Sequence, residues 1–286
     1  MAFFLLISRL PFWWLYRLSD LLCFLLYKGL KYRLKVVRSN LSHSFPEKSE
    51  SERREIEKAF YAHLCDVIVE TIKLLTISES ELRSRVSHEN PEILFPHFRN
   101  GGSFISMAPH LGNWEWLLAG NKIYLGCEVD AVYKPLSSPF FEKLMLRVRS
   151  RFGSFPVPST RILRIEAERK SISRAIAMVA DQTPGPENAF VQVFLNRPTL
   201  FFRGPQKLAH TFQYPVFYAS MDKTGRGHYR IRIEEIAICP LPGEDEILKR
   251  FIQKLEADIR KQPAFWLWSH KRWKHKIPGG DPVAPA

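Results

Sequence analysis

One histidine and one glutamate, five positions apart, carry the chemistry that this sequence offers most clearly. The segment APHLGNWE contains His110 and Glu115. An apolar run ends at Ala108, so His110 is expected at the carboxyl end of a strand, where α/β proteins bind their ligands. A histidine supported by a carboxylate is a typical general base, because the carboxylate orients the ring and raises its basicity.

The turn before the next helix decides whether these two side chains can meet. On one continuous helix, residues five positions apart diverge by about 140°. Pro109 and Gly112 predict a turn instead, and the helix is expected to begin near Asn113. Glu115, in the first helical turn, would then accept the Nδ1 proton of His110 and leave Nε2 free as the base. Spacing alone leaves open the alternative of a structural histidine at a helix start.

No nucleophile of the protein itself accompanies this pair. The sequence contains no GxSxG motif and no CxxC pair. The scattered cysteines argue against a zinc module or a disulfide framework and are typical of a reducing compartment. The attacking group would therefore be a hydroxyl of a substrate, in a reaction without metal or cofactor. The four cysteines are Cys23, Cys65, Cys127 and Cys239.

Short apolar runs alternate with helical stretches from Gly101 onward. This alternation predicts an α/β fold in which helices sandwich a mixed, mostly parallel sheet. The last two strands, separated by the turn MDKTGRGH, are expected to be antiparallel. The expected strands are residues 103–108, 129–133, 175–180, 216–220 and 229–235, and the expected helices are residues 114–124, 139–152, 161–173, 203–213 and 243–262.

Several polar residues are expected at the same edge of the sheet as His110. Asp181 follows a predicted strand and precedes a Thr-Pro-Gly-Pro turn, so it either supports the site or stabilises the turn. Lys134 follows another predicted strand and is expected at the mouth of the site. Arg149 and Arg151 end a basic helix, and one of them is expected to bind a substrate phosphate. The alternative for both is a solvated face that the helix C-terminus favours.

A long amphipathic helix is predicted over residues 51–76. Within it, the spacing of His63, Asp66 and Glu70 imitates a metal site. No second cluster completes such a site, so we expect these residues on a solvated or helix-packing face.

The N-terminal segment 3–27 is rich in Phe, Trp and Leu. As one helix it would span roughly 38 Å, enough to cross a hydrocarbon core of about 30 Å, and Pro11 is expected to kink it. Its charged residues Arg9, Arg17 and Asp20 fall in one narrow sector of the helix. The helix is therefore expected to lie in the membrane interface or to pack this charged stripe on its own protein.

A basic flank follows the apolar segment and contains no acidic residue. By the positive-inside tendency, this flank stays on the cytoplasmic side. We therefore divide the chain into a membrane-associating N-terminal helix with its flank, residues 1–38, and a single domain, residues 39–286. The basic residues of the flank are Lys28, Lys31, Arg33, Lys35 and Arg38.

The composition restricts the class of protein and of partner. The 286 residues include 42 Lys and Arg against 29 Asp and Glu, a net charge of +13. With 25% charged and 45% hydrophobic residues, the chain is neither disordered nor a bundle of membrane helices. The positive charge favours nucleic acid, anionic lipid, phosphate or an acidic carrier protein. The ending, residues 264–276, interleaves Trp with basic residues, but no nucleic-acid-binding signature accompanies it, so interface anchoring or core packing is expected.

The HLGNWE segment matches the H-x4-D/E signature of glycerolipid-type acyltransferases. Over nearly its whole length the chain more closely resembles the late (secondary) acyltransferases of lipid A biosynthesis, the lauroyl and myristoyl transferases of Gram-negative bacteria. The chain departs from that pattern at Lys134, where many relatives carry Arg, and in a shortened stretch before Gly204. The segments that carry the resemblance are RSNL (38–41), APHLGNWE (108–115), VYKP (132–135), RSRFG (149–153), DQ (181–182), GPQKLAHTFQYPVFY (204–218) and PAFWLWSHKRW (263–273).

The resemblance implies transfer of a fatty acyl chain from a thioester on acyl carrier protein to a hydroxyl of a lipid A precursor. It implies a glycerolipid acyltransferase-like fold, His110 as general base and Glu115 as its support, at the cytoplasmic face of the bacterial inner membrane. Backbone amides near Gly112 or a nearby cation would stabilise the oxyanion. The expected substrate-binding residues are Asn113, Lys134, Arg149, Arg151, Asp181 and Gln182.

Two alternatives remain at this point. One is an acyltransferase that acts on another glycolipid or on a lysophospholipid. The other is a basic membrane-binding protein without catalysis. Membrane lipids are expected partners in each case, and nucleic acid is not.

Overall fold

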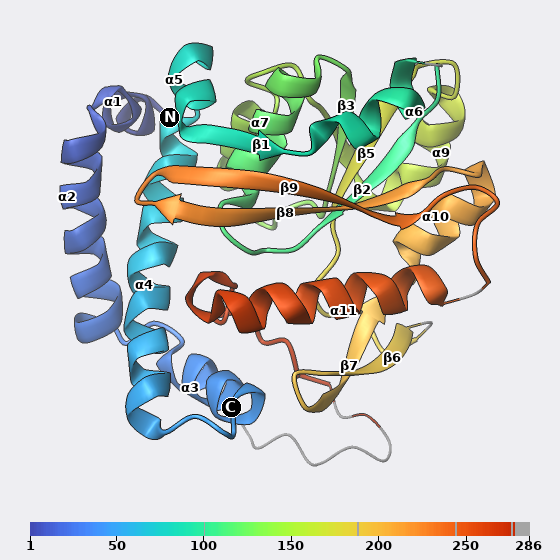
Figure 1. Cartoon of the computed structure of the whole chain (residues 1–286). Helices are drawn as coiled ribbons and strands as arrows, with labels where there is room; N and C mark the ends of the chain where they lie inside the picture. The colour runs from blue at the N-terminus through green and yellow to red at the C-terminus, as the bar shows by residue number, and fades with distance from the viewer. Residues whose placement is uncertain (100, 188, 244, 276, 278–286) are drawn as a thin grey trace.

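A seven-stranded sheet forms the centre of the protein (Figure 1). The computed structural model describes residues 1–99, 101–187, 189–243, 245–275 and 277. The strand order is β1-β9-β8-β2-β5-β3-β4. All neighbouring strands run parallel except β8 and β9, which are antiparallel as predicted. The strands are β1 (Val86–Glu89), β2 (Phe104–Ala108), β3 (Glu128–Tyr133), β4 (Phe155–Pro158), β5 (Arg174–Val179), β8 (Val216–Gly225) and β9 (His228–Ala237).

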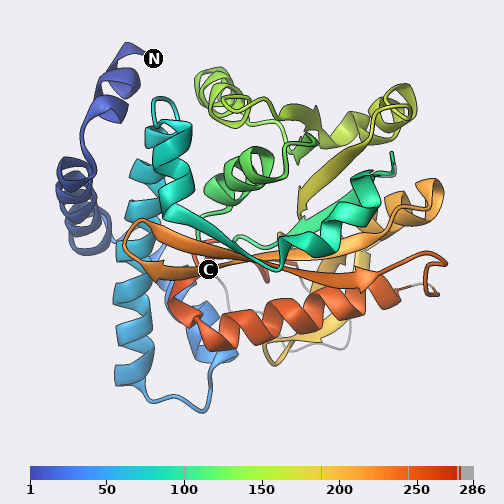
Figure 2. The ribbon, with the colours of Figure 1, turned by 45° about the horizontal axis from the view of Figure 1, so that its top comes forward.

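Helices cover both faces of this sheet (Figures 1 and 2). One face carries α11, with the antiparallel hairpin β6–β7 beyond it, and the other face carries α7 and α9 (Figure 1). The predicted α/β sandwich with a mixed, mostly parallel sheet is therefore confirmed. These elements are α5 (Glu79–Arg85), α6 (Phe95–Arg99), α7 (Trp114–Leu125), α8 (Pro139–Arg149), α9 (Ile162–Glu168), β6 (Ala189–Phe194), β7 (Arg197–Phe202), α10 (Gly204–Phe212) and α11 (Glu246–Lys261), with short 3-10 turns η2 (Pro91–Leu94), η3 (Ser159–Arg161) and η4 (Pro263–Phe265).

The N-terminal segment is not one helix: it is broken at Pro11, where the sequence predicted a kink. It consists of α1 (Ala2–Arg9), α2 (Phe12–Cys23) and the π-helix η1 (Phe24–Gly29). The break falls at Leu10 and Pro11, whose backbones are extended, because proline clashes with the preceding turn of a helix. Within the described part of the chain, no helix is long and apolar enough to cross a membrane.

Two further helices connect this segment to the body: α3 (Leu34–Ser44) and α4 (Glu50–Lys73). A capping box at Ser49, closed by Glu52, begins α4. Figure 1 shows α2 at the outer edge of the molecule, with α4 beside it on the inner side. Because α2 buries Phe12 and Leu15, the N-terminal segment is packed onto the domain along one side.

The polar residues of α4 form a buried helix-packing face. Asp66 accepts a hydrogen bond from Ser19 of α2 at 2.8 Å and pairs with Arg226 of the β8–β9 turn. Arg226 also pairs with Asp20, so part of the charged stripe of α2 packs on its own protein. Glu70 accepts a hydrogen bond from Tyr16 at 3.0 Å. These contacts place the predicted face between helices and not in solvent.

Candidate active site

Two neighbouring parallel strands end side by side at the site. In the pair β2–β5, Ala108 lies opposite Val179, so His110 and Asp181, each two residues further on, reach the same edge of the sheet. Oδ1 of Asp181 lies 2.5 Å from Nδ1 of His110, and Oδ2 accepts the backbone amide of His110 at 2.8 Å. His110 and Asp181 therefore form a dyad.

Burial and several hydrogen-bond donors determine the charge of Asp181 in this dyad. Asp181 is buried, and its Oδ2 also accepts a hydrogen bond from Nε1 of Trp266 at 2.7 Å. Burial raises the pKa of Asp181, but attraction to His110 and the hydrogen bonds from His110 and Trp266 outweigh burial and hold the pKa at about 2. Asp181 is thus a carboxylate at neutral pH and accepts a hydrogen bond from Nδ1 of His110, while Nε2 of His110 faces the NH2 group of Gln182, which can only donate.

The reactive nitrogen of His110 faces an amide. Nε2 of Gln182 lies 3.2 Å from Nε2 of His110, and the indole of Trp114 packs edge-on against the imidazole at 5.0 Å between ring centroids. The His110 side chain is 14% exposed. The ring of His110 is therefore not fully enclosed, and the Gln182 amide occupies the position beside Nε2.

Glu115 does not contact His110, so the predicted Nδ1 acceptor is wrong. Its carboxylate is nearly buried and accepts two hydrogen bonds from Arg149, from Nε at 3.0 Å and from Nη2 at 2.7 Å. His110 lies in the turn, where Asp181 holds both its backbone and its ring, whereas Glu115 lies in the first turn of α7 and meets α8. The sequence did place Asp181 at this edge of the sheet, with active-site support as one of two readings.

The predicted cations occupy different environments. Arg149 is held by Glu115 and lies 5.8 Å from the centroid of the Tyr133 ring, so it is a fixed and largely buried cation. Arg151 is exposed, above the ring of Phe152. Lys134 is exposed immediately after β3. For Arg151 and Lys134, a substrate contact stays a prediction.

Asn113 is not available to a substrate, which corrects its predicted role. Its side chain is fully buried, because Oδ1 caps α7 by accepting the amide of Trp116 at 3.0 Å. Its Nδ2 donates to Glu70 at 2.7 Å. The amide of Gly112 is also occupied, since it donates to the carbonyl of Phe265 at 3.0 Å, so it is no free donor for an oxyanion.

Residues 265–272 form a wall of the site that the sequence did not reveal. Leu267 donates its amide to the carbonyl of His110 at 3.1 Å, and Trp266 forms a β-bridge with Leu111. Nε2 of His270 accepts the amide of Thr183 at 3.2 Å. The signal in the sequence was the Trp-rich ending itself. Core packing, one of the two roles expected for it, is confirmed, because Trp266, Trp268 and Trp273 are buried. Lys276, in the same basic ending, lies outside the described residues.

A buried arginine extends this wall. Arg272 donates from Nη1 to Thr183 at 3.3 Å, and its guanidinium lies 4.4 Å from the centroid of the Phe201 ring. Burial lowers the pKa of Arg272 to about 9, against attraction to Asp181, so the group is charged at neutral pH. Thr183 in turn donates to the Arg272 carbonyl at 2.6 Å. Arg272 therefore holds the loop that carries Asp181 and Gln182.

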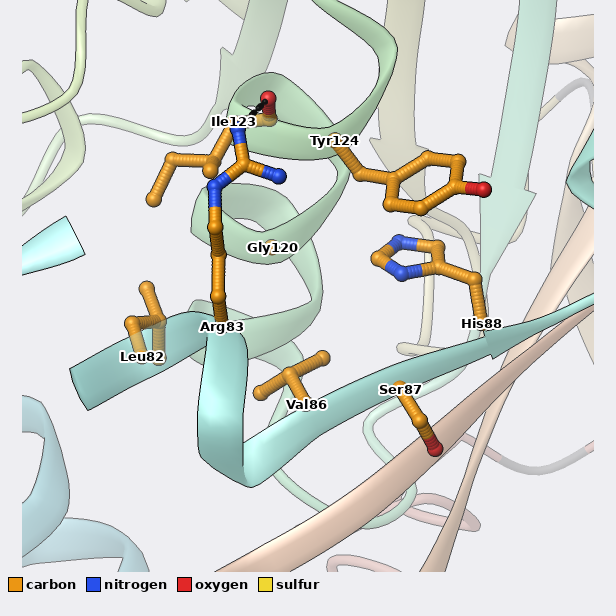
Figure 3. A pocket seen from close by; sticks show the side chains of 8 residues that line it. All are labelled: Leu82, Arg83, Val86, Ser87, His88, Gly120, Ile123 and Tyr124. Carbon is orange, nitrogen blue, oxygen red and sulfur yellow. Dashed lines mark hydrogen bonds between the residues drawn. The ribbon is translucent and has the colours of Figure 1, made fainter. Parts of the chain in front are cut away.

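One pocket lies away from the dyad. A pocket of about 310 Å³ opens between α5, β1 and the C-terminal end of α7 (Figure 3). In it, His88 stacks on Tyr124 at 4.2 Å between centroids and Nε2 of His88 meets Oδ1 of Asn121 at 3.1 Å. His110 is at the opposite end of α7, which is about 18 Å long, so this pocket takes no part in the chemistry of the dyad.

Known proteins resemble the chain along most of its length. Residues 1–275 match the model of the family described as bacterial lipid A biosynthesis acyltransferase. The lipid A biosynthesis myristoyltransferase of Escherichia coli is 26% identical to it over 260 residues, which cover 84% of this chain and 75% of that protein. The lipid A biosynthesis acyltransferase 1 of Shigella flexneri is also 26% identical over 260 residues, with the same shares of both chains.

Proposed function

The chain belongs to the bacterial lipid A biosynthesis acyltransferase family, and from this premise we propose that it transfers a fatty acyl chain from acyl carrier protein to a hydroxyl of a lipid A precursor. The family, and with it the activity of an acyltransferase, confirms the resemblance that the sequence motifs indicated. The carrier protein as donor, the precursor hydroxyl as acceptor and the residue roles below are our proposal. The observation that carries the roles is the dyad of His110 and Asp181, in which the His110 side chain is 14% exposed.

His110 acts as the general base on the acceptor. Its Nε2 takes the proton of the hydroxyl as the oxygen attacks the thioester carbonyl, and a tetrahedral intermediate forms. The intermediate collapses, the C–S bond breaks, and the imidazolium returns the proton to the leaving thiolate, so an ester and a free thiol result. Asp181 stabilises the transient imidazolium through its contact at Nδ1.

Gln182 is the donor nearest to the reacting atoms. Its amide meets Nε2 of His110 before substrate binds. When the hydroxyl takes that place, the amide is released beside the forming intermediate and donates to its oxyanion. The occupied amide of Gly112 and the buried side chain of Asn113 support this choice.

Glu115 and Arg149 have a positioning role. The bidentate pair fixes the guanidinium of Arg149 at the C-terminal end of α8 and joins it to the first turn of α7. Nη1 of Arg149 lies on the side away from these two bonds and is the donor left for a phosphate of the acceptor or of the donor arm. Lys134, exposed immediately after β3, contacts the same substrates in this proposal.

The net charge supports an acidic donor and an anionic membrane. The chain carries +13, and acyl carrier protein is acidic, so the two attract each other. Outward-facing apolar residues of α2 and η1, among them Trp13, Trp14 and Phe24, support contact with the cytoplasmic face of the inner membrane.

Reconstitution with defined substrates tests this function. Purified protein is mixed with an acylated carrier protein and a lipid A precursor that bears a free 3-hydroxyacyl chain, and the product is identified by mass spectrometry. We expect one added acyl mass, and a rate that falls about 10²–10⁴-fold in His110→Ala. If the protein acylated a lysophospholipid but not the lipid A precursor, the lysophospholipid would be assigned as the acceptor. Equal rates in the wild type and His110→Ala would refute the mechanism.

A further inference from the structure

A strip of phenylalanine rings joins the N-terminal segment to α8. Phe3 and Phe4 of α1 pack at 5.6 Å between centroids, Phe4 packs on Phe140 of α8 at 5.8 Å, and Phe140 packs on Phe141 at 5.4 Å. Phe3, Phe140 and Phe141 are 66%, 43% and 50% exposed. Residues more than 130 positions apart thus build one continuous aromatic surface, which we call the Phe strip. Contiguous exposed aromatic surface of this kind marks a site of contact.

The apolar surface continues on both sides of the Phe strip. Leu136, in the loop before α8, is 45% exposed. On the other side, α1, α2 and η1 expose many large apolar side chains, while the opposite side of α2 is buried on α4. Figure 1 shows α1 and α2 at the outer edge of the molecule. These exposed side chains are Leu6, Trp13, Trp14, Leu18, Leu21, Phe24 and Leu25.

Basic residues accompany this surface and identify its partner. Exposed cations occur in both the N-terminal segment and the segment around α8, and among the described residues none of them pairs with a carboxylate. Interleaved Trp, Phe and basic side chains are typical of proteins that sit in the interface of an anionic bilayer. A second copy of this chain would carry the same positive charge and repel it. The cations are Arg9, Arg17, Lys28, Lys31, Lys35, Lys134 and Lys143.

We propose that the Phe strip inserts into the surface of an anionic lipid bilayer, so that the protein contacts the membrane through α8 as well as through its N-terminal helices. The geometry has a consequence for the active site. From Phe140 near its N-terminal end, α8 extends about 13 Å to Arg149. Arg149 holds Glu115, which follows Trp114, and Trp114 packs on His110. For the active site, and resting on the proposed function, it follows that the dyad lies within reach of an acceptor that is still anchored in the membrane.

Vesicle flotation of the full-length protein tests the docking surface. The probes are vesicles of phosphatidylcholine with 30% phosphatidylglycerol and vesicles of phosphatidylcholine alone. We expect Phe140→Ser/Phe141→Ser to weaken partitioning onto the anionic vesicles about tenfold or more, because both rings leave the apolar phase. The matched control is Val191→Ser/Val193→Ser, whose two valines are 48% and 63% exposed. Both belong to β6, a strand that lies beyond α11 from the central sheet (Figure 1). The control should partition like the wild type.

A second variant protects the test against misfolding. Phe3→Ser changes the most exposed ring of the strip and leaves α8 intact, so it should also weaken partitioning, and circular dichroism should show native folding. Unchanged partitioning in both variants would refute the proposal. Sedimentation that shows a dimer of the wild type without lipid, and a monomer of Phe140→Ser/Phe141→Ser, would assign the strip to a second copy and likewise refute it.

Activity measurements separate this inference from the proposed function. With acceptor dispersed in detergent, Phe140→Ser/Phe141→Ser should keep the kcat of the wild type, whereas with acceptor in vesicles its rate should fall with its partitioning. His110→Ala should bind vesicles like the wild type and fail in both assays. If His110→Ala transferred acyl chains at the rate of the wild type, the proposed role of His110 would fail while the docking result stood. If the strip variant transferred acyl chains from vesicles at the normal rate, the membrane role of the strip would fail alone.

Discussion

Asp181 holds His110 at two points, with Oδ1 at 2.5 Å from the ring nitrogen Nδ1 and Oδ2 at 2.8 Å from the backbone amide. Both the orientation of the ring and the position of the turn therefore depend on one carboxylate. Trp266 donates to the same carboxylate, so the C-terminal segment takes part in this arrangement.

Asp181→Asn should lower kcat about 10²–10⁴-fold, because the amide can bind Nδ1 but no longer stabilises the imidazolium. Glu115→Gln should cost less in kcat, because Glu115 acts on Arg149 and not on His110. The measurement is kcat for both variants with saturating donor and acceptor, with folding checked by circular dichroism. A larger loss in Glu115→Gln than in Asp181→Asn would show that Glu115 supports the base in the reacting complex.

Glu115 and Arg149 should behave as one buried ion pair. Removing either partner leaves the other charge unpaired, so Glu115→Ala and Arg149→Ala should each lower the free energy of unfolding by about 3 kcal/mol. The double variant should lose less than the sum of the two, by at least about 1 kcal/mol. Urea denaturation of the four proteins measures this coupling. Strictly additive losses would contradict the bidentate pair.

Gln182→Ala should lower kcat about 10²-fold if its amide stabilises the oxyanion. A donor in which sulfur replaces the carbonyl oxygen of the thioester accepts weaker hydrogen bonds. This replacement should therefore slow the wild type more than it slows Gln182→Ala. Were kcat unchanged and only the KM for the acceptor raised, Gln182 would be an acceptor-binding residue without an oxyanion role.

Glu70 should make stability depend on pH near neutrality. Burial raises the pKa of Glu70 to about 7, against the hydrogen bonds from Tyr229 and Asn113 that lower it. The folded protein thus holds the proton more tightly than the unfolded chain, so this contribution is fully present below pH 4.5 and is lost as pH rises through about 7. It amounts to about 3 kcal/mol at most. Urea denaturation between pH 5 and 8 should show a decline in the wild type that Glu70→Gln reduces, whereas parallel curves would exclude Glu70 as its source.

Salt should weaken the encounter with acyl carrier protein more than the chemical step. Charges on the two surfaces are screened over about 8–10 Å at ordinary ionic strength, so the KM for the carrier should rise with salt while kcat stays nearly constant. Lys143→Glu, on the exposed side of α8, should copy the effect. Lys170→Glu is the control with the same change of charge. Lys170 is exposed and precedes β5, so it lies near the amino ends of the strands, whereas the dyad lies at their carboxyl ends. If the KM for the carrier changed neither with salt nor in Lys143→Glu, the excess of basic residues would be assigned to contact with membrane lipid.

The sequence predicted the strands that carry the site and their common edge, because long apolar runs and the turns after them are local signals. It did not predict β1 and β4, which have four residues each and lie at the two edges of the sheet. β4 contains two prolines, which are typical of edge strands and weaken any strand signal. The hairpin β6–β7 was also missed. In the structure, Leu195 and Asn196 form its two-residue turn, and both adopt the positive φ that such a turn requires.

The sequence by itself determined that His110 follows a strand, that a turn precedes α7, and that the chain resembles an acyltransferase family. These features depend on neighbouring residues and on motif order. Which carboxylate meets His110 was decided only by the tertiary structure, because the register of β2 on β5 places Asp181 beside it from 71 positions away. The contact of Glu115 with Arg149, and of Phe4 with Phe140, likewise depends on how helices pack. Spacing along the chain fixes which residues share an element, whereas the packing of distant elements fixes which side chains touch.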